Sequence, residues 1–311
     1  MRSSTDTLTT TDGTPLFVRR WLPDGPGRAV VQLAHGMAEH SARYERFAER
    51  LTREGYAVYA ADHRGHGQTA SSATPDHGYL ADRAGFDTVV ADLHAVTEMA
   101  RRQHPDLPVV LFGHSMGSFL ARAYVLTWGH ELAGLVLSGT AGDPGALGRV
   151  GRVVALAQAR ARGRRHPSGL MNTLTFGQYN APFKPNRTAF DWLSRDPEEV
   201  DKYVADLECG NVFTAGFYAD LLEGLARVNA DGEVSRVSKD LPILLVSGDM
   251  DPVGGMGKGV ARVAAQYERL GVRDVTMKVY PEARHELLNE TNRDEVMDDI
   301  VAWLAERLPA H

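Results

Sequence analysis

Apolar positions along the chain form short continuous runs that alternate with longer segments of helical spacing. The short runs are bounded by Gly, Pro and Asp, as is typical of strands covered on both faces. These runs are Leu16–Leu22, Ala29–Ala34, Tyr56–Ala61, Val109–Phe112, Leu132–Ser138, Ile243–Val246 and Val275–Tyr280. The segments with helical spacing are Ala42–Glu54, Ala84–Gln103, Met116–Trp128, Gly257–Leu270 and Arg293–Leu308. The alternation predicts an α/β fold with a mostly parallel central sheet flanked by crossover helices.

The strand rhythm stops after Thr140 and resumes at Leu241. The block between them lacks runs typical of buried strands, and the sheet would be incomplete without the strands that follow. We therefore predict one core, residues 1–141 and 239–311, with a helical cap inserted at 142–238; a separate second domain is the weaker alternative. The helical pieces expected in the cap are Leu147–Ala161, Arg187–Leu193, Pro197–Leu207 and Phe213–Val228.

Composition narrows the classes of function. The 311 residues are 43% hydrophobic and 24% charged, which is ordinary for a globular protein, and the net charge of −6 gives no basic field for nucleic acid. The polar N-terminus does not resemble a secretory signal, and no run approaches the roughly 18 apolar residues of a membrane span. We expect a cytoplasmic protein. The single cysteine, Cys209, lies in no Cys or His cluster along the sequence, so neither a metal nor a cofactor is expected.

The sharpest local motif is Gly-His-Ser-Met-Gly at 113–117, which follows an apolar run and opens a helical segment. In that setting a Gly-x-Ser-x-Gly pattern predicts a nucleophile elbow. Glycines at 113 and 117 permit the tight turn, and Ser115 then stands at the N-terminus of a helix. We predict that Ser115 is the nucleophile of a serine hydrolase.

A serine hydroxyl needs a base to accept its proton and an acid to orient that base, and after a nucleophile elbow these follow in the order acid, then histidine. Among the 12 histidines, His285 follows the last predicted strand, whereas His311 is the final residue. His285 is therefore the predicted base. For the acid, spacing after the strand at 243–246 favours Asp251, with Asp249 and then Asp143 as alternatives.

Acyl transfer passes through a tetrahedral oxyanion that backbone N–H groups must stabilise. One donor is expected from Met116, directly after the nucleophile. The second is expected from Met37 in the turn after the strand at 29–34, where Gly36 lets the backbone turn inward.

Five segments together resemble the monoacylglycerol lipase/lysophospholipase group of α/β-hydrolases, over roughly residues 5–140 and 240–308. These segments are His35–Tyr44, Asp62–Gly67, Gly113–Gly117, Gly248–Asp251 and Tyr280–His285. The resemblance implies the α/β-hydrolase fold, a triad of Ser115, Asp251 and His285, and oxyanion donors at Met37 and Met116. It also implies a serine carboxylic-ester hydrolase that works through an acyl-enzyme.

The implied substrates are small-molecule acyl esters, in the order monoacylglycerols, lysophospholipids and simple carboxylic esters. The same triad can also serve an amidase or peptidase, a thioesterase or a cofactor-free perhydrolase. Because fold does not determine function, a non-catalytic binding protein is the alternative outside enzymes.

Other clusters have both a functional and a structural interpretation. The cap segment Arg149–His166 carries six arginines and no acid among valines and leucines, which fits either a transient contact with anionic lipid or a solvated lid. The aromatic residues of the cap either line an acyl pocket or, as we expect, pack the cap against itself and the core. Glu39, His40, Arg43 and Tyr44 are expected to support the oxyanion turn. Asp62, His63, Arg64 and His66 are expected to hydrogen-bond within their loop rather than to hold a metal.

Overall fold

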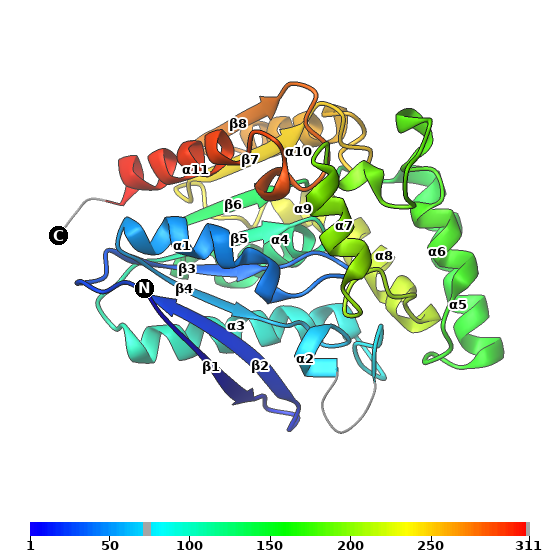
Figure 1. Cartoon of the computed structure of the whole chain (residues 1–311). Coiled ribbons are helices and arrows are strands. Elements are labelled where there is room, and N and C mark those ends of the chain that lie inside the picture. The colour runs from blue at the N-terminus through cyan, green and yellow to red at the C-terminus, as the bar shows by residue number, and fades with distance from the viewer. Residues whose placement is uncertain (71–75, 309–311) are drawn as a thin grey trace.

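The computed structural model describes residues 1–70 and 76–308, and in these ranges eight strands form a single sheet (Figure 1). Their order across the sheet is β1-β2-β4-β3-β5-β6-β7-β8. Strands β1 and β2, at one side of the sheet, run antiparallel to their neighbours, and every pairing from β4 to β8 is parallel. The strands are β1 (Arg2–Thr9), β2 (Pro15–Leu22), β3 (Ala29–Ala34), β4 (Tyr56–Ala61), β5 (Val109–His114), β6 (Gly134–Ser138), β7 (Ile243–Gly248) and β8 (Val275–Tyr280). This arrangement is the expected α/β-hydrolase fold.

The five central strands, β3 to β7, are buried along their whole length because helices cover both faces of the sheet. Alternate residues of one strand therefore enter two different cores: Leu111 packs on one face, and Phe112 on the other. One face is covered by α1 (Glu45–Arg53) and α11 (Arg293–Arg307). The other is covered by α3 (Gly85–Gln103), α4 (Met116–Trp128) and α10 (Lys258–Arg269). Burial of each large apolar side chain contributes about 1.5–3 kcal/mol.

The segment between β6 and β7 contributes no strand to this sheet. It contains α5 (Gly145–Arg162), α6 (Gly169–Phe176), α7 (Pro197–Ala205), α8 (Ala215–Val228) and α9 (Asp231–Val234). Helices α5 to α8 stand beyond the carboxyl ends of the parallel strands (Figure 1). The anchor is α8, whose Phe217 and Tyr218 join the same core as Phe86 of α3. We retain the boundaries 142–238 as the proposed cap.

Several local expectations differ from the structure. The expected helix at Arg187–Leu193 is wrong, because only Asp191–Leu193 forms a 3-10 turn. The apolar side chains of the segment 187–193 pack, but the side chain of Asp191 accepts hydrogen bonds from the backbone of residues 187 and 188. These bonds close a loop in place of a helix. Strand β1 and helix α6 had no counterpart in the apolar pattern, because β1 is almost wholly polar and α6 is short. The four-residue helix α2 (Gly67–Ala70) follows β4.

Candidate active site

Ser115 lies at the sharp turn between β5 and α4. Its φ of 50° and ψ of −119° are unusual for a residue with a side chain, and such strain of about 1–3 kcal/mol is found mainly at functional sites. A Cβ atom at Gly113 would lie 2.4 Å from the carbonyl oxygen of Gly117, and one at Gly117 would lie 2.0 Å from that of Ala34. Only glycine therefore fits on either side of the serine.

His285 and Asp251 form a buried pair in the loops after β8 and β7. The His285 Nδ1 atom lies 2.9 Å from Asp251 Oδ1, and the two side chains are 2% and 0% exposed. The same Oδ1 accepts the backbone N–H of Val253 at 2.9 Å. Burial alone would lower the pKa of His285, but the charge and hydrogen bond of Asp251 raise it above its ordinary value. The pair can therefore hold an imidazolium out of water.

The two alternative acids lie elsewhere. Asp249 is half-buried, and its backbone N–H donates to the carbonyl of Tyr280. Asp143 is exposed and accepts the N–H of Gly145 at the start of α5. The carboxylate that contacts His285 belongs to Asp251, whereas His311 lies outside the described residues.

Three neighbours enclose the His285 ring. His114, the residue before Ser115, has its ring centroid 4.7 Å away, and burial lowers the pKa of His114 to about 4, so that it is neutral at pH 7. Trp192, from the segment between α6 and α7, lies 5.1 Å away. Gly139, directly after β6, has a φ of 58°, and a Cβ atom there would lie 2.9 Å from His285 Cε1. A side chain at residue 139 would therefore crowd the imidazole, and the positive φ also favours glycine there.

The turn after β3 lies against the nucleophile. A Cβ atom at Gly36 would lie 3.2 Å from the Cβ atom of Ser115, and the Gly36 N–H donates to Glu39 Oε1 at 2.5 Å. Met37 follows in this turn. Met116 is the first residue of α4, so its N–H has no partner within the helix. The two predicted oxyanion donors thus come from segments that flank Ser115, and their role stays a prediction.

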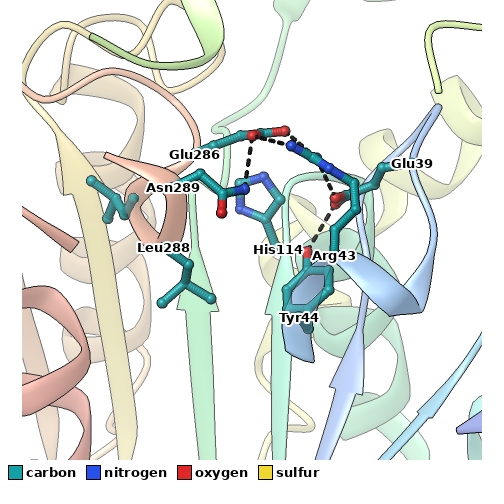
Figure 2. Close-up of a pocket in the computed structure, with 8 residues that line it drawn as sticks. Glu39, Arg43, Tyr44, His114, Glu286, Leu288 and Asn289 are labelled. Carbon is teal, nitrogen blue, oxygen red and sulfur yellow. Dashed lines mark hydrogen bonds and ion pairs between the residues drawn. The ribbon is translucent and has the colours of Figure 1, made fainter. Parts of the chain in front are cut away.

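Charged residues beside this turn form a buried network, shown in Figure 2. Arg43 bonds Glu286 at 2.5 and 2.7 Å and Glu39 at 2.8 Å, while the Tyr44 hydroxyl donates to Glu39 at 2.8 Å. Although burial opposes ionisation, the charge and hydrogen bonds of Arg43 lower the pKa of Glu286 to about 2. Glu39, Arg43 and Tyr44 support the turn as expected. Glu286, directly after His285, was not predicted from sequence.

The loop after β4 is held by hydrogen bonds of its own side chains. Asp62 accepts the backbone N–H groups of Ser41 and Gln68, each at 2.8 Å. Arg64 forms a buried ion pair with Asp92 at 2.6 Å. Burial lowers the pKa of His63 to about 4 and that of His66 to about 3. The expectation of hydrogen bonding within the loop is confirmed for Asp62 and His66, whereas Arg64 bonds side chains outside the loop.

The aromatic residues of the proposed cap pack as expected, in two groups. Phe213 and Phe217 join the main core, whereas Trp192 packs with Phe176 and Tyr179. The contact of Trp192 with His285 was not predicted, because the two residues are far apart in the sequence. The backbone supports it, since the Leu193 carbonyl accepts the N–H of Glu286 at 2.8 Å.

Comparisons with known proteins match nearly the whole chain. Residues 25–292 match the family described as serine aminopeptidase, S33. The chain is 34% identical over 291 residues to a monoacylglycerol lipase of Mycolicibacterium smegmatis, covering 93% of this chain and 92% of the relative. It is 28% identical over 310 residues to the monoglyceride lipase of Mus musculus, covering 97% and 91%. The crystal structure of a carboxyl esterase from Bacillus coagulans in complex with glycerol superposes with a TM-score of 0.91 at 29% identity, covering 99% of each chain.

Proposed function

We propose that this chain, a member of the serine aminopeptidase S33 family of α/β-hydrolases, cleaves the ester bond of monoacylglycerols. The premise is that it is a serine ester hydrolase of the monoacylglycerol lipase-like group. The observation that carries the proposal is the buried His285–Asp251 pair beside the strained turn of Ser115. The relatives support the substrate: two are named monoacylglycerol or monoglyceride lipase, and the bacterial esterase was crystallised with glycerol, the alcohol that such a reaction releases.

The proposed mechanism has two acyl-transfer steps. The Oγ atom of Ser115 attacks the ester carbonyl while His285 accepts the hydroxyl proton, and Asp251 stabilises the resulting imidazolium. The N–H groups of Met37 and Met116 stabilise the oxyanion. The C–O bond to glycerol then breaks, and His285 gives its proton to the leaving oxygen. Water, deprotonated by His285, then attacks the acyl-Ser115 ester. The C–Oγ bond breaks, His285 returns the proton to Ser115 Oγ, and the fatty acid is released.

The outer face of α5 supports access to lipid. Leu147, Val150 and Val153 are 84%, 61% and 66% exposed, although they are apolar. Of the six arginines here, Arg152, Arg164 and Arg165 pair with acidic side chains, whereas Arg149, Arg160 and Arg162 have no acidic partner within the described ranges. Exposed apolar residues beside unpaired cations favour transient contact with an anionic lipid surface. In the described parts of the chain, no helix has the length and apolar character needed to cross a membrane.

An aminopeptidase is the second candidate, because the matching family is described as serine aminopeptidase. An aminopeptidase needs an acidic or polar group that recognises a free α-amino group. If this chain had that activity, it would hydrolyse aminoacyl-p-nitroanilides. Esterase activity alone is expected here.

Two measurements test the proposal. A fluorophosphonate probe should label the wild type but not Ser115→Ala. The control is Ser235→Ala, which removes an exposed serine outside the site and should be labelled like the wild type. Hydrolysis of 1-monoacylglycerols, lysophosphatidylcholine and aminoacyl-p-nitroanilides should then be compared. Equal labelling of Ser115→Ala refutes the nucleophile, and faster cleavage of the anilides than of the monoacylglycerols refutes the substrate.

A further inference from the structure

Two sets of three potential metal ligands converge within the described residues, and one of them joins the oxyanion turn to the cap. This set consists of His40, Asp206 and Cys209, whose ligand atoms lie within 4.8 Å of one another. We propose that these three side chains form a zinc-binding site that clasps the cap onto the oxyanion turn. The site is separate from the hydrolytic chemistry and does not depend on the proposed function.

The two cap ligands are presented by one tight turn. The Cys209 N–H donates to the Asp206 carbonyl at 3.1 Å, and the Glu208 N–H donates to Asp206 Oδ1 at 2.9 Å. Gly210 follows with a φ of 71°. A pair of ligands separated by two residues on a tight turn is the usual way in which short zinc motifs present half of their ligands.

The third ligand, His40, already lies opposite this turn, with Nε2 2.8 Å from Asp206 Oδ2. Tetrahedral zinc with bonds of about 2.0 Å to nitrogen or oxygen and about 2.3 Å to sulfur places its ligand atoms about 3.3–3.6 Å apart. The present spacing therefore needs only small side-chain movements. On binding, the His40–Asp206 hydrogen bond would open and the ring would carry its proton on Nδ1 instead of Nε2. The Cys209 thiol would lose its proton to solvent, and water would complete the four ligands. Asp206 is 34% exposed, which provides a path for the ion to enter.

The surrounding charges permit a cation. Burial raises the pKa of the Cys209 thiol, and the nearby charge of Arg43 acts in the opposite direction. The arginine charge is, however, paired with two carboxylates, those of Glu39 and Glu286. Together with Asp206, these groups leave a net negative charge at the site.

A metal at this position would act on the oxyanion turn directly. The carbonyl of Ala38, beside Met37, accepts the N–H of Gly210 at 3.0 Å and the hydroxyl of Tyr203 at 2.8 Å. Both donors belong to the cap segment, and Gly210 follows the ligand Cys209. Zinc would therefore link the cap to the oxyanion turn in addition to these two hydrogen bonds. Because it would bind the folded state, zinc should raise the melting temperature of the protein.

The second set, His94, Glu98 and Glu131, provides a matched control. It has no thiol. Glu131 is already bonded to Arg101 at 3.1 Å, and the ring of His94 stacks on Trp128 at 4.3 Å. A variant at His94 should therefore leave metal binding by Cys209 unchanged.

Cobalt reports on zinc sites through the absorption of thiolate-to-cobalt charge transfer. We expect the reduced wild type to bind one Co²⁺ with such a band in the near ultraviolet, and Zn²⁺ to abolish it by displacement. Cys209→Ser should lack the band and the rise in melting temperature with zinc, whereas His94→Gln should keep both. Asp206→Asn and His40→Asn retain the thiol and should weaken zinc binding at least about tenfold. The proposal is overturned if the wild type shows no band, or if these two variants bind as tightly as the wild type.

Discussion

The guanidinium of Arg43 holds the carboxylate of Glu286 through two hydrogen bonds, of 2.5 and 2.7 Å, and Glu286 directly follows His285. The same guanidinium bonds Glu39, which accepts the N–H of Gly36 beside Ser115. One buried cation thus connects the loop of the proposed base with the turn of the proposed oxyanion site. The positions of two parts of the site that are far apart in the sequence are therefore coupled.

Glu286→Gln should be both less stable and altered in its pH profile. Breaking this buried pair leaves Arg43 partly uncompensated, which should lower the free energy of unfolding by about 3 kcal/mol. The negative charge of Glu286 also raises the pKa of His285, so its removal should shift the acid limb of kcat/KM to lower pH. Urea unfolding and pH–rate profiles measure the two effects. Glu282→Gln, an exposed carboxylate of the same loop, should change neither, and an unshifted acid limb in Glu286→Gln would contradict the coupling.

Asp251→Asn should lower kcat about 10⁴-fold, because the amide favours the wrong tautomer of the histidine and does not stabilise the imidazolium. Asp249→Asn should retain most of the activity, since His285 bonds Asp251. Both kcat values should be measured on variants whose circular dichroism matches the wild type. Loss of turnover in Asp249→Asn alone would assign the acid to Asp249.

Stability should decrease on acidification because buried histidines are neutral in the folded state. Burial lowers the pKa values of His63, His66 and His114 to about 4, 3 and 4. Their contribution is complete above the ordinary value of about 6.5 and is lost as pH falls toward 4. His285 acts in the opposite sense: its raised pKa adds stability below about 6.5 that is lost as pH rises through the folded value.

The urea midpoint of the wild type should therefore fall between pH 7 and pH 5. His66→Asn keeps a donor near the position of Nδ1, which lies 2.9 Å from the Arg64 carbonyl, but it cannot be protonated. Its midpoint should depend less on pH than that of the wild type. An identical dependence would show that His66 is not protonated on unfolding. In the same pH range, kcat/KM should decrease as His285 becomes protonated, through a pKa above 6.5.

Substitutions on the outer face of α5 should affect the hydrolysis of lipid substrates alone. The double variant Leu147→Ser/Val150→Ser removes two exposed apolar side chains, each able to contribute about 1.5–3 kcal/mol when buried. Binding to anionic vesicles should weaken at least about tenfold, and hydrolysis of dispersed long-chain monoacylglycerol should fall with it. Hydrolysis of a soluble short-chain ester should be unchanged. Leu207→Ser, which removes a 91% exposed leucine elsewhere in the cap, is the control; an equal effect there would contradict a role specific to α5.

The buried strands could be predicted from the sequence. Helices cover both faces of these strands, so almost every residue along each one is apolar. Strand β1 was missed for the opposite reason: at the edge of the sheet it buries little, and Leu8 is its one apolar residue. The turn residues Asp12 and Gly13, between β-branched threonines, were the available signal for a hairpin with β2. At 187–193, apolar spacing alone predicted a helix, but the side chain of Asp191 bonds the backbone and closes a loop.

Site residues within one motif were predicted more readily than contacts between motifs. The positions of Ser115 and His285 follow from chain order and local pattern. The packing of Trp192 against His285 depends on how the segment after α6 returns to the loop after β8, and local patterns do not encode that path. Arg43 was placed near the oxyanion turn, but its partner Glu286 is defined only by the fold.

The close approach of Gly139 to the His285 ring has a consequence for other chains of the same fold. A Cβ atom at this position would lie 2.9 Å from Cε1 and 3.0 Å from Nδ1 of the His285 ring. An alanine or serine at that position would crowd the ring of the proposed base and make it shift, while the elbow, the acid and the histidine all remained readable in the sequence. Such a chain would keep its hydrolase motifs but should turn over substrate more slowly, so the residue after β6 is part of what sets the position of the base.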